Sequence, residues 1–142
     1  MTRQEQRAWI MLVTAIGGYA VYLVIVLSAA THAPLPDIAY VAPLLWTIGG
    51  AIAVSIVVGI VAGIVSSKES SLADQRDRDI ARFGDAVGRA FLVIGGVGAL
   101  LLALVDTDGF WIANLLYLAF VCSAVFGGVA KLAAYRRGIP AW

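Results

Sequence analysis

The sequence predicts an all-α integral membrane protein, a four-transmembrane-helix bundle made of two antiparallel hairpins. Of its 142 residues, 61% are hydrophobic and only 13% are charged, with a mean hydropathy of +0.92. A soluble domain carries about twice this share of charged residues, and with this composition it would expose large apolar patches. The prediction also rests on four apolar runs long enough to cross a bilayer and on the placement of Lys and Arg between them.

The basic residues predict the orientation of the chain. All ten lie in three places: before the first apolar run, around the gap between the second and third, and at the end of the fourth. Cytoplasmic flanks of membrane helices collect Lys and Arg. We therefore expect both termini and the middle loop to be cytoplasmic, in a single multi-pass domain over residues 1–142 in the bacterial inner membrane.

The first two spans are separated by a proline-containing loop. The first span is expected over about 8–30, which is too long for the apolar core of a signal peptide. Trp9 stands at its cytoplasmic edge, where an indole favours the interface. Pro34 and Pro36 disfavour helix at the residues before them, so the second span follows them, over about 39–65.

A charged segment over residues 66–86 separates the second and third spans. Its second part contains no helix breaker before Gly84. We therefore predict a charged cytoplasmic helix that continues directly into the third span, over about 87–105. The turn-forming residues at 106–109 then lead into the fourth span, over about 110–134.

Acidic and basic residues alternate along this segment, and the pattern has more than one interpretation. The acid-first pairs Asp74–Arg78 and Asp85–Arg89 are four residues apart, and each stabilises a solvated helix by about 0.2–0.5 kcal/mol. Alternatively, the pattern gives specificity to a docking surface for a protein partner at the cytoplasmic face. Clustered basic residues also attract anionic lipids of the bilayer, although the interleaved aspartates weaken that interpretation. The candidate interaction surface consists of Asp74, Arg76, Asp77, Arg78, Asp79 and Arg82.

The run Asp74-Gln75-Arg76-Asp77, followed by Ile80 and a membrane span, carries a family resemblance. It resembles the Asp-Glu-Arg-Asp signature of small uncharacterised bacterial four-span membrane proteins, in which the motif also precedes the third span. Gln75 stands where the signature has Glu. The likeness covers the layout of the whole chain, and it implies the four-span topology rather than an activity.

Asp85, Arg89 and Lys131 form a candidate ion-pair zone at the inner interface. Asp85 and Lys131 are about equally far from the turn between the third and fourth spans, so an antiparallel hairpin places them at similar depth. Ionisable groups at such depth are costly and usually face a partner or water. We predict that Asp85 pairs with Lys131 or Arg89. In the alternative, the two basic side chains extend separately to the headgroups.

Small residues recur every four positions along the second and fourth spans. This spacing lets helix backbones approach closely in lipid. It predicts either packing within the bundle or a homodimer that forms through the second span. The candidate helix-packing residues are Ser55, Gly59, Gly63, Ser123 and Gly127, with Gly84, Gly88 and Gly95 on the third span.

The sequence indicates no catalytic, cofactor or metal site and no nucleic-acid-binding surface. His32 is the only histidine, and the single Cys122 therefore lacks a plausible histidine base. Asn114 and Tyr117, toward the outer end of the fourth span, are expected to make interhelical hydrogen bonds.

We therefore expect a non-enzymatic small membrane protein, an accessory or regulatory interaction partner that uses its charged cytoplasmic helix. The middle of every span lacks Asp, Glu, Lys, Arg and His. Ion-coupled transport normally needs such a group near the bilayer midplane. The alternative is a small transporter or channel subunit that acts as a homo-oligomer.

Overall fold

The computed structural model describes residues 3–66 and 71–139, which fold into four long α-helices. The described part contains no β-strand, and the all-α, four-helix prediction is confirmed. The helices are α1 (Arg3–Ala29), α2 (Val41–Ser66), α3 (Ser71–Leu104) and α4 (Gly109–Arg137), with the short 3-10 helix η1 (Leu35–Asp37) between α1 and α2.

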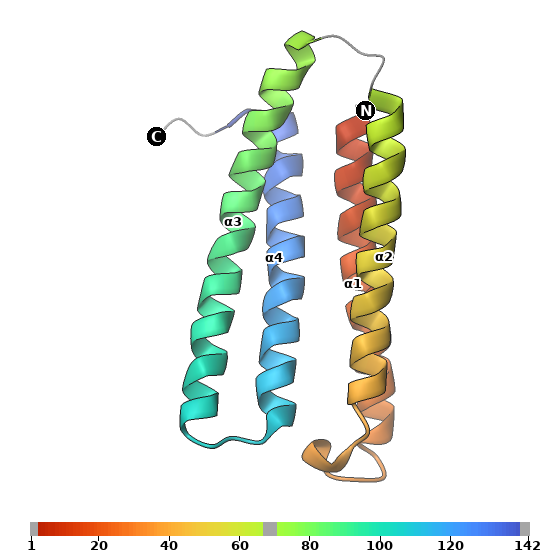
Figure 1. Cartoon of the computed structure of the whole chain (residues 1–142), viewed down its shortest axis with the longest axis vertical. Helices are drawn as coiled ribbons and strands as arrows, with labels where there is room; N and C mark the ends of the chain where they lie inside the picture. Colours follow the sequence, from red (N-terminus) through yellow and green to blue (C-terminus); the bar gives the residue numbers. More distant parts are fainter. Residues whose placement is uncertain (1–2, 67–70, 140–142) are drawn as a thin grey trace.

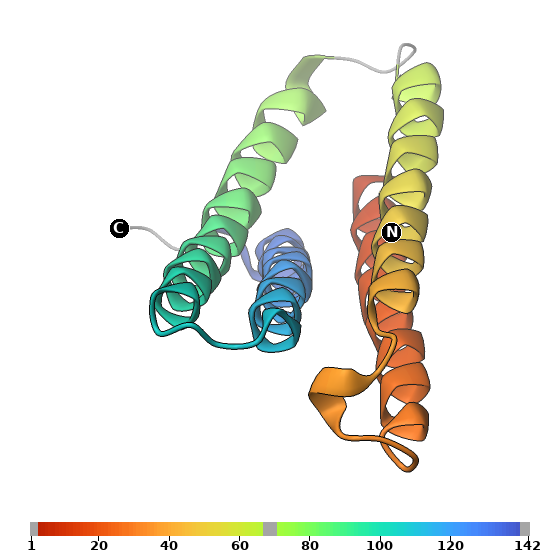
Figure 2. The ribbon, with the colours of Figure 1, turned by 60° about the horizontal axis from the view of Figure 1, so that its bottom comes forward.

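The four helices form two antiparallel hairpins, α1–α2 and α3–α4 (Figure 1). The start of α1 and the end of α4 lie at one end of the molecule, which we call the terminal end. The turn at residues 105–108 and η1 lie at the other, which we call the turn end. Figure 2 shows the same two hairpins from a second direction. α4 packs against both α3 and α1, whereas α2 packs against α1, so the hairpins are joined mainly through α1 and α4.

All four α-helices are long and apolar enough to cross a membrane. Their candidate spans have 24 to 30 residues, each with an 18-residue stretch whose mean hydropathy is 2.0 to 2.4, and about 20 residues suffice. Many large apolar side chains face outward, among them Ile64 and Leu104, which are 70% and 73% exposed. This composition and exposure suggest a multi-pass membrane protein.

The charged segment and the third span form one helix, as the sequence predicts. α3 has 34 residues, which corresponds to about 51 Å at a rise of 1.5 Å per residue. This exceeds the roughly 30 Å of a hydrocarbon core. The N-terminal part of α3 extends past the ends of the other three helices (Figure 1). Residues 67–70 of the charged segment lie outside the described residues.

The other boundaries lie close to those predicted, with one difference. α1 begins at Arg3 rather than at residue 8, because the polar residues before Ala8 contain no helix breaker and Glu5 suits the first turn. α2 and α4 begin and end within about three residues of the expected positions, which is the ordinary uncertainty of a helix end.

Small residues bring α3 and α4 close together along most of their length. A Cβ atom added at Gly88 would lie 2.9 Å from Ser123 Oγ, and one at Gly127 would lie 2.9 Å from the Gly84 carbonyl oxygen. At Gly95 it would collide with the Ala119 Cβ. Ser123 and Gly127 therefore serve packing within the chain, one of the two uses that their spacing predicts.

The small residues of α2 do not make such close contacts with another helix. A Cβ atom added at Gly63 would meet nothing within 4 Å, and one at Gly59 would meet the Arg7 side chain at 3.4 Å. Ser55 is exposed. Within residues 3–66 and 71–139, this row is not used to pack helix backbones.

Candidate functional site

The charged N-terminal part of α3 is attached to α4 along one side. Ile80 is 1% exposed, and Asp77 Oδ1 accepts a hydrogen bond from the hydroxyl of Tyr135 at 3.1 Å. The side chains of Arg76, Arg78, Asp79 and Arg82 are exposed, and those of Arg78 and Arg82 border the space between the hairpins. The side chain of Asp74 lies outside the described part of the structure. The predicted surface is therefore divided: Asp77 contacts α4, Arg78 and Arg82 border the space between the hairpins, and Arg76 and Asp79 lie outside it.

Asp85 and Lys131 lie together across the α3–α4 seam. Lys131 Nζ is 2.8 Å from Asp85 Oδ1, so Lys131 is the partner that the structure gives to Asp85. Because Asp85 is 62% exposed, this ion pair contributes about 1 kcal/mol or less. Arg89 does not join the pair. No carboxylate of the described side chains lies within salt-bridge distance of its guanidinium group.

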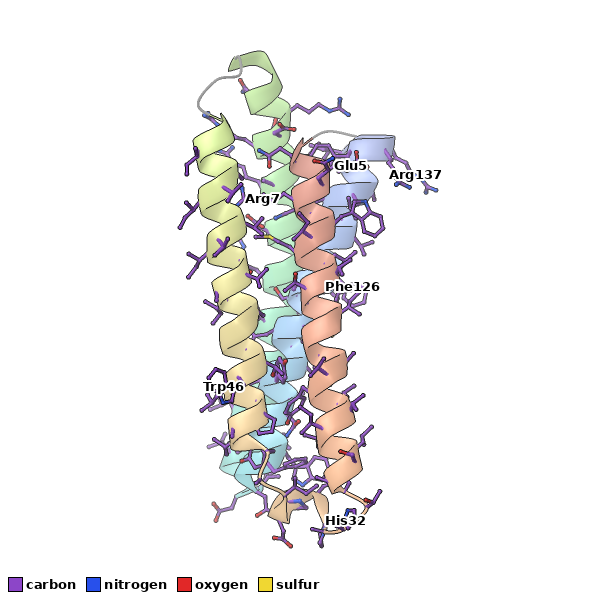
Figure 3. All side chains as sticks on the ribbon, turned by 90° about the vertical axis from the view of Figure 1, so that its right-hand side faces the viewer. Glu5, Arg7, His32, Trp46, Phe126 and Arg137 are labelled. Atoms are coloured by element: carbon purple, nitrogen blue, oxygen red, sulfur yellow. The ribbon has the colours of Figure 1, made fainter. Side chains whose placement is uncertain are left out.

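A second ion pair links α1 to α4 at the terminal end. Arg136 Nε lies 3.7 Å from Glu5 Oε1. Figure 3 shows Glu5 at the start of α1, at the same end as Arg137. Sequence reasoning did not select Glu5, because its pairing depends on how α1 and α4 pack.

A groove of about 1370 Å³ lies between the hairpins and is lined by residues of all four helices. The sequence alone does not predict this groove, because it lies where helices of the two hairpins face each other without packing closely. Within the described residues, the extensive contacts of α2 with another helix are those with α1. Figure 3 labels Arg7 between α1 and α2, and this residue lines the groove.

The lining of this groove has a charged part and an apolar part. The charged part contains five basic and two acidic residues, a net charge of +3: Arg7, Arg78, Arg82, Arg89, Lys131, Asp77 and Asp85. The apolar part lies closer to the turn end and includes Ala15, Ile48, Ile52, Phe120 and Val121. The groove therefore changes from charged to apolar along the long axis of the bundle.

Tyrosines close the bundle beyond the apolar part of the groove. The Tyr22 hydroxyl donates to Asn114 Oδ1 at 2.6 Å, and the Tyr117 hydroxyl donates to Thr47 Oγ1 at 2.9 Å. The predicted interhelical hydrogen bonds of Asn114 and Tyr117 are confirmed. The rings of Tyr22 and Tyr117 meet edge to face at 4.9 Å. These contacts tie α1 and α2 to α4, and the groove ends at Tyr117.

The described residues do not assemble a recognisable metal site. No group of three or more His, Cys, Asp or Glu side chains among them is placed to hold a metal ion. His32 is exposed in the loop at the turn end (Figure 3), and Cys122 is a half-buried free thiol.

Comparison of the chain with protein-family models, curated proteins and solved structures gives no match. The resemblance carried by residues 74–77 therefore stays a prediction.

Proposed function

We propose that this protein is a non-enzymatic accessory or regulatory partner of another membrane or cytoplasmic protein. Its contact surface is the exposed side of the N-terminal part of α3, which carries Arg76, Arg78, Asp79 and Arg82. The terminal end faces the cytoplasm, and the chain resides in the bacterial inner membrane.

The way in which the N-terminal part of α3 is held against the bundle along one side is the observation that supports this proposal best. The contacts of Asp77 and Ile80 hold one side of the helix against the bundle. A fixed helix loses little conformational entropy when a partner binds to its exposed side. Charges of both signs on that side discriminate between partners, because like charges that face each other across an interface are unfavourable.

The orientation is supported by charge. The described basic residues gather toward the terminal end, whereas Asp106 and Asp108 lie at the turn end. The positive-inside rule therefore assigns the terminal end to the cytoplasm.

Exchanging two charges on α3 tests the proposed docking surface. Arg76→Asp combined with Asp79→Arg keeps the composition and the net charge but inverts the local pattern. The variant and the original chain, each carrying the same affinity tag, are captured in mild detergent, and co-purifying proteins are quantified by mass spectrometry. We expect the specific partner to fall at least about tenfold in the exchanged variant, as when paired interface charges become opposed.

The matched control is Arg137→Ala, which removes an exposed charge from the terminal end and away from this side of α3. It should leave the captured partner unchanged. Equal capture by the exchanged variant and the original chain would exclude the docking surface.

The exposed small residues of α2 support a second candidate function, a transporter or channel subunit that works as a homo-oligomer. Ser55, Gly59 and Gly63 follow the spacing of close helix contacts, yet no helix backbone in the described part of the chain packs against them. A cysteine at Gly63 would then form a disulfide between chains, and reconstituted protein would carry solute flux. Failure of both measurements would exclude this function.

A further inference from the structure

We propose that the groove between the two hairpins binds an anionic phospholipid from the leaflet at the terminal end. The phosphate would lie among the basic residues, and an acyl chain would lie against the apolar lining. The groove shares Arg78 and Arg82 with the proposed docking surface, whereas Arg76 and Asp79, which the docking test exchanges, lie outside its lining. The two proposals can therefore fail separately.

The depth of the charged lining matches the headgroup layer. About 20 helical residues cross the hydrocarbon core. Counting back from Leu104 at the turn end of α3 places Asp85 at the opposite interface. Arg82 then lies in the headgroup layer, and Arg89 lies about one turn inside it, within reach of the headgroups for an extended side chain.

The basic residues of the groove retain binding capacity for an anion. Lys131 is engaged with Asp85. For Arg7, Arg82 and Arg89, the described side chains provide no carboxylate within salt-bridge distance. Guanidinium groups bind phosphate through paired, charge-assisted hydrogen bonds, and anionic lipids are drawn to clustered basic residues in this layer.

The shape and polarity of the groove favour a lipid over other occupants. Its volume of about 1370 Å³ exceeds the roughly 300–1,000 Å³ of a typical small-molecule pocket. A free anion would leave the part lined by Ile48, Ile52 and Phe120 without a partner. A second copy of the chain would bring its own excess of basic residues to the same depth, and the two positive surfaces would repel.

Lipid retention by the full chain tests the site. The protein is equilibrated in micelles that contain equal amounts of phosphatidylglycerol and phosphatidylcholine, and the lipids that stay bound are measured by native mass spectrometry. We expect preferential retention of phosphatidylglycerol. Arg82→Gln combined with Arg89→Gln should lower the phosphatidylglycerol-to-phosphatidylcholine ratio at least about tenfold, because each basic residue near the headgroups contributes severalfold.

The matched control is Arg76→Gln combined with Arg137→Gln, which removes two exposed charges from the terminal end outside the groove. It should change the ratio by less than about twofold. An equal loss in both double variants would overturn the proposal, because the preference would then come from general surface charge.

A second pair of variants tests the apolar part. Ser55→Trp places a large side chain on the lining and should lower retention of both lipids, whereas Ala53→Trp lies on α2 outside the lining and should not. Thermal unfolding of each variant checks that the bundle is intact. Displacement of phosphatidylglycerol by free glycerol phosphate, or retention of a second chain in place of lipid, would also overturn the proposal.

Discussion

Tyr22 is the largest side chain of α1 that the structure buries completely, with 0% exposure. Its hydroxyl reaches Asn114 on α4, and the Asn114 side-chain amide in turn donates to the Phe110 carbonyl oxygen at 2.8 Å. Each polar group at this buried position therefore has a partner, as the interior of a membrane bundle requires. A single tyrosine combines apolar packing with a specific link between the two hairpins.

Removing this hydroxyl should weaken the bundle measurably. Tyr22→Phe leaves Asn114 Oδ1 without its donor and should lower the free energy of unfolding by about 1 kcal/mol, the range measured for such bonds in membrane proteins. Unfolding in mixed micelles of increasing denaturing-detergent content measures the change. Tyr40→Phe is the control, because the Tyr40 hydroxyl makes no hydrogen bond among the described residues, and the two variants should therefore differ.

The individual helices differ in how they use small residues. α3 and α4 approach closely because Gly88, Gly95 and Gly127 remove the side chains that would hold the backbones apart. The stacked rings of Phe91 and Phe126, with centroids 4.4 Å apart, add a large contact beside the seam. α2 has similar glycines but no comparable neighbour, so spacing alone does not determine which helix a small residue will meet.

Substitutions at two adjacent glycines of α3 distinguish the effect of helix packing from that of helix propensity. Alanine favours a helix over glycine by about 0.5–1 kcal/mol. Gly96→Ala adds a Cβ atom that meets nothing within 4 Å, so this variant should be neutral or stabilised. Gly95→Ala places a Cβ atom against that of Ala119 and should be destabilised by about 1–3 kcal/mol. The same unfolding measurement applies, and equal effects of the two changes would contradict the close seam.

The molecule as a whole has opposite chemical character at its two ends. The terminal end carries the groove, the ion pairs and the charged start of α3, whereas the turn end is closed by tyrosines and two short connections. This asymmetry leads us to place the two ends on different sides of one membrane.

Single cysteines at the two ends of α1 test this orientation. In a Cys122→Ala background, Thr31→Cys should react with a membrane-impermeant maleimide in intact spheroplasts. Gln6→Cys should react only after lysis, because the positive-inside rule places that end in the cytoplasm. Labelling of both positions before lysis would show that α1 does not cross the membrane, and the reverse pattern would invert the proposed orientation.

The sequence predicts the helices well because membrane spans follow from the length and composition of single segments. It also predicts the similar depth of Asp85 and Lys131, because depth within one hairpin depends only on counting residues from a turn. Counting leaves Lys131 and Arg89 both open as partners of Asp85, and the structure pairs Asp85 with Lys131. The groove and the hydrogen bond between Tyr22 and Asn114 could not be predicted in this way. Both arise from the packing of one hairpin against the other, and Tyr22 and Asn114 are separated by 92 positions in the chain.

The central position of α4 has a consequence for the order of assembly. Of the four helices, α4 is synthesised last, yet it provides the contacts that join the two hairpins. While α1, α2 and α3 are already inserted, only α1 and α2 can associate, and the glycines of α3 remain open to lipid or to other helices. The contacts that join the two hairpins can therefore form only after α4 is made, and until then the unfinished chain is open to proteolysis and to chaperones that recognise unpaired apolar helices.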